Sequence, residues 1–465
     1  MKISNKIQLF DTYERQKRTF ISLEDGKVKI YTCGPTVYDY PHIGNLRSYI
    51  FADILRRMFK FNGYKMMQVI NITDVGHLTS DADEGEDKME IKAREQKRSA
   101  LEVAEFYTQI FKRDLVSLNI EAPEIWCKAT EHIKEQIDLI KRLEKLGYTY
   151  QTSDGIYFDT SKVDSYGYLG RIDVDGMQPG LRVELSSEKM NPTDFALWKL
   201  SSREGKRQME WDSPWGTGFP GWHIECSAMA MKYLGDTIDI HTGGIDHIPV
   251  HHTNEIAQSE AATGKKFVDY WLHVAFLTVN GGKMSKSLHN FITLQDIIDK
   301  GHDPLVFRYL ALGSHYRAGL NFTWQSFLGA QEALSSIREK ILSWGKGEAL
   351  PDKDIIENFK SRINNDLNTP QVLGLLWETI ASKLSVAVKR ATILEFDKVL
   401  GLRLSESEKY VLTEVPSLVK ELAEKRETLR KEKKWQESDE ARKQINILGY
   451  DVDDTSKGSK IKKKN

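Results

Sequence analysis

A strand–helix–strand pattern near the start of the chain constrains the fold more than any other feature. Residues 27–33 have the side chains of a strand, residues 46–62 repeat apolar side chains at helical spacing, and residues 65–72 form a second strand-like run. These elements in immediate succession predict a βαβ unit with parallel strands and a right-handed crossover. Because ligands of parallel sheets bind at the carboxyl ends of the strands, we expect Cys33 and the segment around His42 at the ligand-binding edge.

Length and composition limit the remaining possibilities. At 465 residues the chain is long enough for about three domains of roughly 150 residues each, and its 40% share of hydrophobic residues supports sizeable cores. The net charge is −1, so any nucleic acid must be bound by local basic patches. The lysine-rich residues 456–465 are interpreted either as such a patch or as a solvated, disordered terminus.

Cysteine usage and hydropathy indicate the compartment. The chain has three cysteines, no secretory leader and no run of about 18 apolar residues. An odd and sparse set of cysteines argues against a disulfide framework. We therefore expect a cytoplasmic protein without a membrane span.

The rest of the chain is expected to complete the core and to add further parts. Helices are expected at residues 87–118, 130–146 and 251–263, and strands at residues 236–241 and 270–279. Residues 151–225 contain short strands, turns and several tryptophans, and are interpreted as the later part of an insertion. Residues 343–354 contain two glycines and a proline, which predict a linker. Beyond it, residues 372–388 and 420–447 each predict one long amphipathic helix.

These elements predict an α/β protein with a Rossmann-like parallel-sheet catalytic core, an inserted subdomain and a C-terminal α-helical bundle. We expect the first half of the core at residues 1–119, an inserted connective subdomain at 120–225, the second half of the core with a connecting region at 226–342, and a helical domain with a basic tail at 343–465.

The segment Pro41 to Asn45 has the properties of a phosphate-binding helix start. Proline pre-sets the backbone before the helix, and His42 and Asn45 share a helix face. A helix N-terminus attracts anions, and Gly44 would let a flat base approach the backbone. The pattern suits ATP, with its base against Gly44 and its phosphates near His42. The alternative is an ordinary helix start whose histidine forms a local hydrogen bond.

Residues 281–287 join a glycine pair to two lysines, Lys283 and Lys286. A lysine ammonium group is compact and suits phosphate oxygens, and phosphoryl chemistry depends on charge neutralisation. The alternative is a solvated basic loop. Neither this segment nor the first one is a Walker loop, because the chain has no G-x-x-x-x-G-K-[ST] run.

Two cysteines, a histidine and a glutamate form a candidate metal set. His251 and Glu255 are four residues apart on an expected helix, so both can face one point, where Cys33 and Cys226 could join them. Thiolate, imidazole and carboxylate ligands suit zinc. Spacing alone also allows free buried cysteines. His252 competes with His251 as the ligand, and the spacing to Glu255 favours His251 only slightly.

Motifs spread along the whole chain carry a resemblance to one enzyme family. They lie at residues 31–39, 42–45, 71–74, 194–199, 213–216, 221–229, 251–255, 283–287, 365–370 and 396–402. The first reads YTCGPTVYD and leads into HIGN, and the segment at 283–287 reads KMSKS. Together these segments resemble the cysteinyl-tRNA synthetases, a family of class I aminoacyl-tRNA synthetases, and the last two resemble the family's helical tRNA-binding region.

The resemblance implies one zinc ion per chain, held by Cys33, Cys226, His251 and Glu255 and joined directly by the substrate thiolate. Zinc binds sulfur strongly, whereas a serine hydroxyl is a poor ligand at neutral pH. Selection through a required bond can exceed the discrimination of a pocket that senses size alone. An editing domain is then unnecessary, and the sequence indicates none.

The resemblance also implies the reaction of a cysteine–tRNA ligase. L-cysteine is activated with ATP to cysteinyl-adenylate and pyrophosphate, and the acyl group passes to the 3′ adenosine of tRNA-Cys. ATP, accompanied by Mg²⁺, is expected to be bound by His42, Gly44, Asn45, Lys283 and Lys286. His42 and the two lysines are expected to stabilise charge in the transition state. The amino-acid pocket is expected to be lined by Thr73, Trp222 and His241. We expect a monomer.

The chain departs from the family pattern in several places. Asn45 stands where histidine is usual, Thr253 replaces a common glutamate, and His289 replaces a glycine. Residues 454–460 and the lysine tail replace the usual C-terminal end. Two rival functions remain at this point: a ligase that joins cysteine to an amino sugar, whose relatives lack the helical end, and a non-catalytic RNA-binding paralogue.

Overall fold

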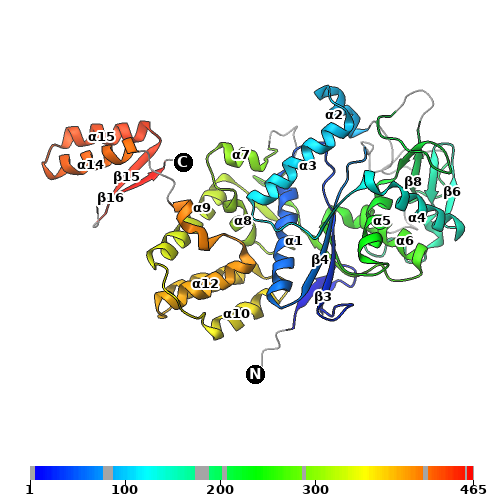
Figure 1. The fold of residues 1–465 in the computed structure, drawn as a ribbon, viewed down its shortest axis with the longest axis horizontal. Coiled ribbons are helices and arrows are strands. Elements are labelled where there is room, and N and C mark those ends of the chain that lie inside the picture. Colours follow the sequence, from blue (N-terminus) through cyan, green and yellow to red (C-terminus); the bar gives the residue numbers. More distant parts are fainter. Residues whose placement is uncertain are drawn as a thin grey trace. The chain divides into compact units, whose positions relative to one another are not determined.

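The computed structural model describes residues 6–76, 87–172, 188–201, 207–284, 290–411, 417–455 and 458–463 (Figure 1). The chain divides into two compact units. The first comprises Met1–Leu334 and Lys346–Leu402, and the second comprises Ser335–Gly345 and Arg403–Asn465. Each unit is described by itself below.

A parallel sheet forms the centre of the first unit. Its strands are β3 (Lys27–Thr32), β4 (Lys65–Ile72), β5 (Ile125–Lys128), β10 (Ile238–Gly244) and β11 (Val268–Val274). Their order is β11-β10-β3-β4-β5, and every neighbouring pair is parallel. The predicted βαβ unit and the Rossmann-like core are therefore confirmed. A hairpin of β1 (Gln8–Asp11) and β2 (Gln16–Thr19) precedes the sheet.

Helices cover both faces of this sheet. α1 (Ile43–Phe61), the crossover between β3 and β4, lies on one face, and α5 (Trp222–Leu234) lies on the other (Figure 1). α6 (Thr253–Thr263) connects β10 to β11 and packs against α5. The side chains at the centre of the sheet are fully buried, including Ile30, Val69 and Ile240. Burial of these apolar side chains holds the layers together.

The part between β4 and α5 contains helices and a second, antiparallel sheet. The helical elements are α2 (Lys88–Gln96), α3 (Ala100–Ser117), η1 (Ala129–His132), α4 (Ile133–Lys145) and η2 (Thr160–Lys162). The sheet has the order β6-β7-β8-β9, with β6 (Thr149–Gln151), β7 (Gly155–Phe158), β8 (Phe195–Leu200) and β9 (Gly218–Pro220). β7, β8 and β9 lie within residues 151–225, which the sequence predicted as short strands and turns, and β6 begins two residues before that segment.

The chain after β10 returns to the core and then becomes helical. It contains η3 (Ile245–His247), η4 (Ile248–His252), β12 (Leu277–Val279), β13 (Gly282–Lys283), α7 (Leu294–Asp299), α8 (Pro304–Leu312), β14 (Leu320–Phe322), α9 (Trp324–Ser343), α10 (Lys353–Ile363), α11 (Thr369–Ala381) and α12 (Val386–Leu400). α12 packs against α1. The predicted helix at 372–388 is wrong in extent, because α11 ends at Ala381 and Ser385 caps a new helix by accepting a hydrogen bond from the Val388 N–H.

The second unit ends in a helical pair and a β-hairpin. Its elements are η5 (Leu404–Glu406), α13 (Ser407–Val411), α14 (Ser417–Lys431), α15 (Trp435–Ile447), β15 (Tyr450–Thr455) and β16 (Gly458–Lys463). Val419, Leu422, Ala423, Ile445 and Val452 form its apolar core. The predicted single helix at 420–447 is therefore wrong, since α14 and α15 are separate helices.

The lysine-rich end of the chain contributes a strand. β16 pairs antiparallel with β15, and the register places Lys462 opposite Asp451 and Lys460 opposite Asp453. Residues 458–463 are therefore an ordered hairpin strand, in place of the disordered terminus that the sequence also allowed.

Candidate metal centre and nucleotide site

Four side chains from separate elements converge beside the carboxyl end of β3. Cys33 directly follows β3, Cys226 lies on α5, His251 lies in the π-helical turn η4, and Glu255 lies on α6. One ligand atom from each of the four lies within 4.8 Å of the others, and all four residues are buried. The structure thus brings together the residues that the sequence singled out as a metal set.

The geometry of Glu255 fits a shared metal ion. His251 Nε2 lies 3.0 Å from Glu255 Oε1. This oxygen is buried and has no hydrogen-bond partner among the described residues. Two ligand atoms on a tetrahedral ion with bonds of about 2.1 Å lie about 3.4 Å apart. A close contact without hydrogen-bond geometry is what two ligands of one ion would show, so the donor set fits a cation such as Zn²⁺.

The electrostatics of the cluster also favour a cation. A hydrogen bond from Cys33, helped by nearby His251, lowers the pKa of the Cys226 thiol to about 6. Burial raises the pKa of Glu255, but the charges of His241 and His251 outweigh it and lower the value to about 2. A thiolate and a carboxylate therefore lie together in a dry site. Burial of such charges is costly unless an opposite charge compensates them. Against the effect of burial, the charges of Glu255 and Cys226 raise the pKa of His251 to about 10, so a protonated His251 supplies that charge when no cation is bound.

A second, overlapping set could also hold an ion. Cys33, His241, His252 and Glu255 offer ligand atoms within 4.8 Å of one another as well. His252 Nε2 lies 3.4 Å from Cys33 Sγ, and its Nδ1 lies 2.7 Å from His273 Nε2. The structure therefore leaves His252 close to the site. The first set contains two sulfur ligands, and this makes it the better match for a thiophilic ion.

His42 begins α1 and caps it with its own ring. His42 Nδ1 accepts a hydrogen bond from the Asn45 N–H at 3.1 Å, and Asn45 Oδ1 accepts one from the His42 N–H at 3.2 Å. The local hydrogen bond that an ordinary helix start would make is thus present. His42 Nε2 makes no hydrogen bond within the described part of the chain, so it can donate to a ligand.

Gly44 is required by the His42 ring. A Cβ atom at Gly44 would lie 3.0 Å from the ring atoms of His42 and 3.4 Å from Met284 Cε. The distances to His42 are tighter than ordinary van der Waals contacts, whereas the distance to Met284 is an ordinary contact. The glycine therefore lets the ring fold back over the first turn of α1, whether or not a base also lies there.

The start of α1 contacts the chain just after residues 285–289. The Ile43 N–H donates to the Ile292 carbonyl at 2.9 Å, and the Phe291 ring lies edge-on to the His42 ring, with centroids 5.3 Å apart. Lys283 ends β13 and is exposed. Lys286 lies outside the described residues. Segments flanking residues 285–289 on both sides thus contact the start of α1.

Comparison with known proteins gives the family. Residues 19–332 match the family described as tRNA synthetases class I (C), catalytic domain. The cysteine–tRNA ligase 1 of Burkholderia lata is 51% identical over 456 residues, covering 98% of this chain and 96% of the relative. The cysteine–tRNA ligase of Treponema denticola is 45% identical, covering 96% and 98%. The chain belongs to the class I cysteinyl-tRNA synthetase family. The predictions of this family and of an enzyme of this class are confirmed.

A solved structure shows the same fold at greater distance. The methionyl-tRNA synthetase of Mycobacterium tuberculosis, bound by methionyl-adenylate, aligns with a TM-score of 0.55 at 13% identity, covering 83% of this chain and 92% of that protein. At this identity the likeness concerns the fold alone. It agrees with the Rossmann-like core and the helical end described above.

Two of the three residues predicted to line an amino-acid pocket, Trp222 and His241, contact proposed metal ligands. Trp222 begins α5, and its ring lies with its centroid 4.4 Å from that of His251. His241 Nε2 lies 3.0 Å from Glu255 Oε2. Thr73 follows β4 and accepts a hydrogen bond from Asn71 Nδ2 at 3.1 Å. The placement of Trp222 and His241 beside the proposed ligands supports a pocket, and the role of all three residues in substrate binding stays a prediction.

Sequence reasoning missed several histidines of the site. His223 Nδ1 lies 3.0 Å from His251 Nδ1, the His247 ring lies 5.3 Å from the His251 ring between centroids, and His273 contacts His252. The dense run of histidines between residues 241 and 252 was the available signal. His223 meets the second ring nitrogen of His251, the position that outer-sphere partners of metal ligands occupy.

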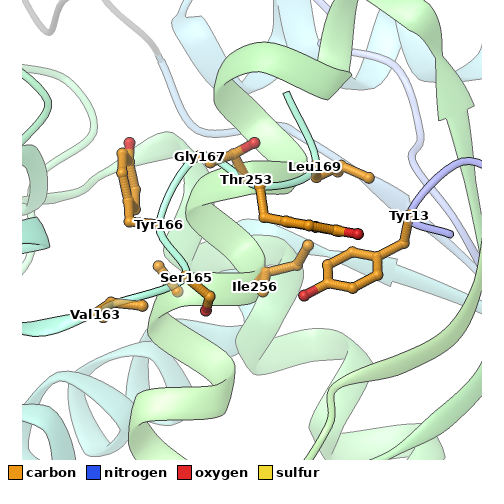
Figure 2. Close-up of a pocket in the computed structure, with 10 residues that line it drawn as sticks. Tyr13, Val163, Ser165, Tyr166, Gly167, Leu169, Thr253 and Ile256 are labelled. Atoms are coloured by element: carbon orange, nitrogen blue, oxygen red, sulfur yellow. The ribbon is translucent and has the colours of Figure 1, made fainter. Parts of the chain in front are cut away.

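A small pocket lies against one side of α6. Tyr13, Tyr166, Leu169, Thr253 and Ile256 are among the residues that line it (Figure 2). Thr253 and Ile256 lie three residues apart on one side of α6, and none of the four proposed ligands is among the residues that line the pocket. This pocket is therefore separate from the proposed metal ligands.

No helix among the described residues has the length and apolar character needed to cross a bilayer.

Proposed function

We propose that this chain is a cysteine–tRNA ligase that activates L-cysteine with ATP and transfers it to the 3′ adenosine of tRNA-Cys. The observation that carries the proposal is the buried convergence of Cys33, Cys226, His251 and Glu255. One Zn²⁺ ion held by these four side chains would supply a thiophilic site to which the thiolate of the substrate binds. A substrate with a hydroxyl in place of the thiol would lose that bond.

The nucleotide would bind at the start of α1. The helix N-terminus and His42 Nε2–H offer donors to phosphate oxygens, and Lys283 and Lys286 would neutralise charge on them, together with Mg²⁺ bound to the ATP. The carboxylate of cysteine attacks the α-phosphorus, the bond to the β-phosphate oxygen breaks, and cysteinyl-adenylate and pyrophosphate form. The 3′-terminal hydroxyl of tRNA then takes the acyl group and AMP leaves.

The side chains beside the cluster would hold the amino acid. Trp222 and His241 contact proposed ligands, so a cysteine whose sulfur reaches these ligands would have its backbone near the two side chains. We propose that Thr73, which follows β4, completes the pocket. Gly44 and Asn45 would shape the nucleotide site indirectly, through the His42 ring and its backbone N–H. Selection at the thiol then needs no editing step.

The tRNA would contact the helical parts of the chain. We propose the functional division 1–119, 120–225, 226–342 and 343–465, with the last part as the tRNA-binding and anticodon-binding domain. In that part the Trp435 ring is 56% exposed, and the Arg430 guanidinium lies 5.6 Å from its centroid. An exposed aromatic ring beside an arginine is suited to stacking on an unpaired base. We propose that the enzyme acts as a monomer in the cytoplasm.

Cysteine-dependent ATP–pyrophosphate exchange tests this function. Zinc-loaded protein is expected to exchange with cysteine and to show background exchange with serine. Cys226→Ala is expected to lose bound zinc and exchange together. Cys127→Ala removes a buried cysteine outside the cluster and is expected to keep both. Background exchange with cysteine by the zinc-loaded protein, or equal exchange with serine, would refute the proposal.

A further inference from the structure

Two helices that carry proposed metal ligands are joined by a buried polar contact. Gln258 on α6 donates from Nε2 to the His223 carbonyl at 2.7 Å and to Ser227 Oγ at 2.6 Å, both on α5. Ser259 on α6 donates to the same Ser227 Oγ at 2.8 Å. Gln258, Ser227 and Ser259 are each 0% exposed. We call these three residues the α5–α6 clasp.

The apolar contacts around the clasp include several short side chains. Ala228 of α5 and Ala257 of α6 belong to the apolar cluster at this interface, and such short side chains allow helices to slide past each other. Hydrogen bonds are directional, and a buried polar group left without a partner is unfavourable. The clasp therefore selects one alignment of α5 against α6.

This alignment sets the spacing of the proposed ligands. Ser227 directly follows Cys226, and His223 lies about one turn before Cys226 on the same helix. Gln258 lies one turn after Glu255, on the same helix side. The clasp thus links the turn that carries a thiolate to the turn that carries a carboxylate. Metal sites tolerate only about 0.2 Å in their ligand distances.

The Gln258 side chain acts at this contact as a hydrogen-bond donor only. Gln258 Oε1 is buried and has no hydrogen-bond partner among the described residues. The buried side chain of Gln258 therefore uses its Nε2 for two hydrogen bonds, while its Oε1 makes none among the described residues. We propose that Gln258 is a positioning residue for the metal centre, acting through Ser227 and the His223 carbonyl. This inference rests on the proposed metal binding.

Cobalt binding to the metal-free protein tests the clasp without measuring catalysis. Gln258→Met keeps the length of the side chain and removes its donor. We expect Co²⁺ affinity to fall about 10-fold or more, as for other residues that orient metal ligands, and the cobalt d–d absorption bands to shift. The Michaelis constant for cysteine is expected to rise more than the one for ATP, because the clasp aligns the thiol site.

A matched control comes from another buried glutamine. Gln136 on α4 is 0% exposed, donates from Nε2 to the Ala129 carbonyl at 2.9 Å, and also has a buried Oε1 without a partner among the described residues. Gln136→Met should lower thermal stability to a similar degree and leave the cobalt affinity and spectrum unchanged. Equal cobalt affinity in both glutamine variants would overturn the inference.

Milder variants keep the test decisive if Gln258→Met does not fold. Ser259→Ala removes one donor to Ser227 and is expected to weaken Co²⁺ binding in the same direction but less. Wild-type affinity in Ser259→Ala would overturn the clasp. A wild-type protein that binds no metal would instead refute the proposed function.

Discussion

His42 illustrates how one side chain serves both the fold and the proposed chemistry. Because Nδ1 accepts a hydrogen bond from the Asn45 N–H, the proton of the neutral ring must be on Nε2. Burial lowers the pKa of His42, so the ring is neutral at physiological pH. The cap therefore prepares Nε2–H as a donor that points away from the helix.

Two substitutions of His42 should separate these roles. Asparagine is a good N-cap, so His42→Asn should keep the thermal stability of the wild type. It cannot reach the phosphates, and we expect cysteine-dependent pyrophosphate exchange to fall about 100-fold or more. His42→Gln should lose about 1 kcal/mol of stability, since the cap is lost. Full exchange activity in a stable His42→Asn protein would contradict this assignment.

Asp114 gives a prediction about pH. Burial raises the pKa of its carboxyl to about 6, against a partial lowering by Arg113. The folded state therefore holds the proton more tightly than the unfolded state, and stability is lost as pH rises from about 4 to about 6. Asp114→Asn should remove this loss. We expect its free energy of unfolding to exceed that of the wild type by about 3 kcal/mol at pH 8 and by less at pH 5, measured by urea denaturation.

At the scale of elements, local patterns predict the core better than the helical parts. The strand at residues 65–72 is predicted with the bounds it has, because its buried second half is mostly β-branched and apolar. The expected helix at 87–118 is two helices, since Ser99 and Glu102 form a capping box that starts α3. The helical spacing of apolar residues continues from α2 into α3, because both helices bury apolar side chains, and the spacing therefore does not reveal the break.

The first unit depends on one buried arginine that joins three helices. Arg308 of α8 is 0% exposed and donates to Asp53 of α1 at 2.6 Å and to the Leu400 carbonyl of α12 at 2.7 Å. Arg308→Met leaves a buried carboxylate and backbone carbonyls with fewer partners. We expect the free energy of unfolding to fall by about 3 kcal/mol or more in urea denaturation.

The control for this prediction is an exposed ion pair. Lys134 pairs with Asp138 at 3.0 Å, with 85% of the lysine side chain exposed. Lys134→Ala should leave the denaturation midpoint unchanged, because exposed pairs contribute little. If Arg308→Met also leaves the midpoint unchanged, the buried network does not hold the helices to the core.

At the scale of the whole molecule, the site could be predicted only through motifs spread over the chain. Spacing alone could not place Cys33 beside Glu255, because that contact is made by a sheet edge and a helix far apart in sequence. It also left His251 and His252 open, since both lie in one π-helical turn. The C-terminal hairpin was missed because only Val452 and Ile461 supply apolar pairing there.

Recognition of tRNA can be separated from adenylate formation. Trp435→Ala should raise the Michaelis constant for tRNA by about 10- to 100-fold, which is the loss of one stacked base, and leave pyrophosphate exchange unchanged. Ile447→Ala changes a side chain that is 83% exposed on the same helix and should leave both unchanged. Equal tRNA charging by the two variants would remove Trp435 from the proposed tRNA contact.

X-ray absorption at the zinc edge tests the central claim most directly. For the zinc-loaded protein we predict two sulfur ligands, from Cys33 and Cys226, and a third sulfur when L-cysteine is added, with no change when serine is added. A folded, active protein without zinc, or a sulfur count that stays at two with cysteine bound, would contradict the account.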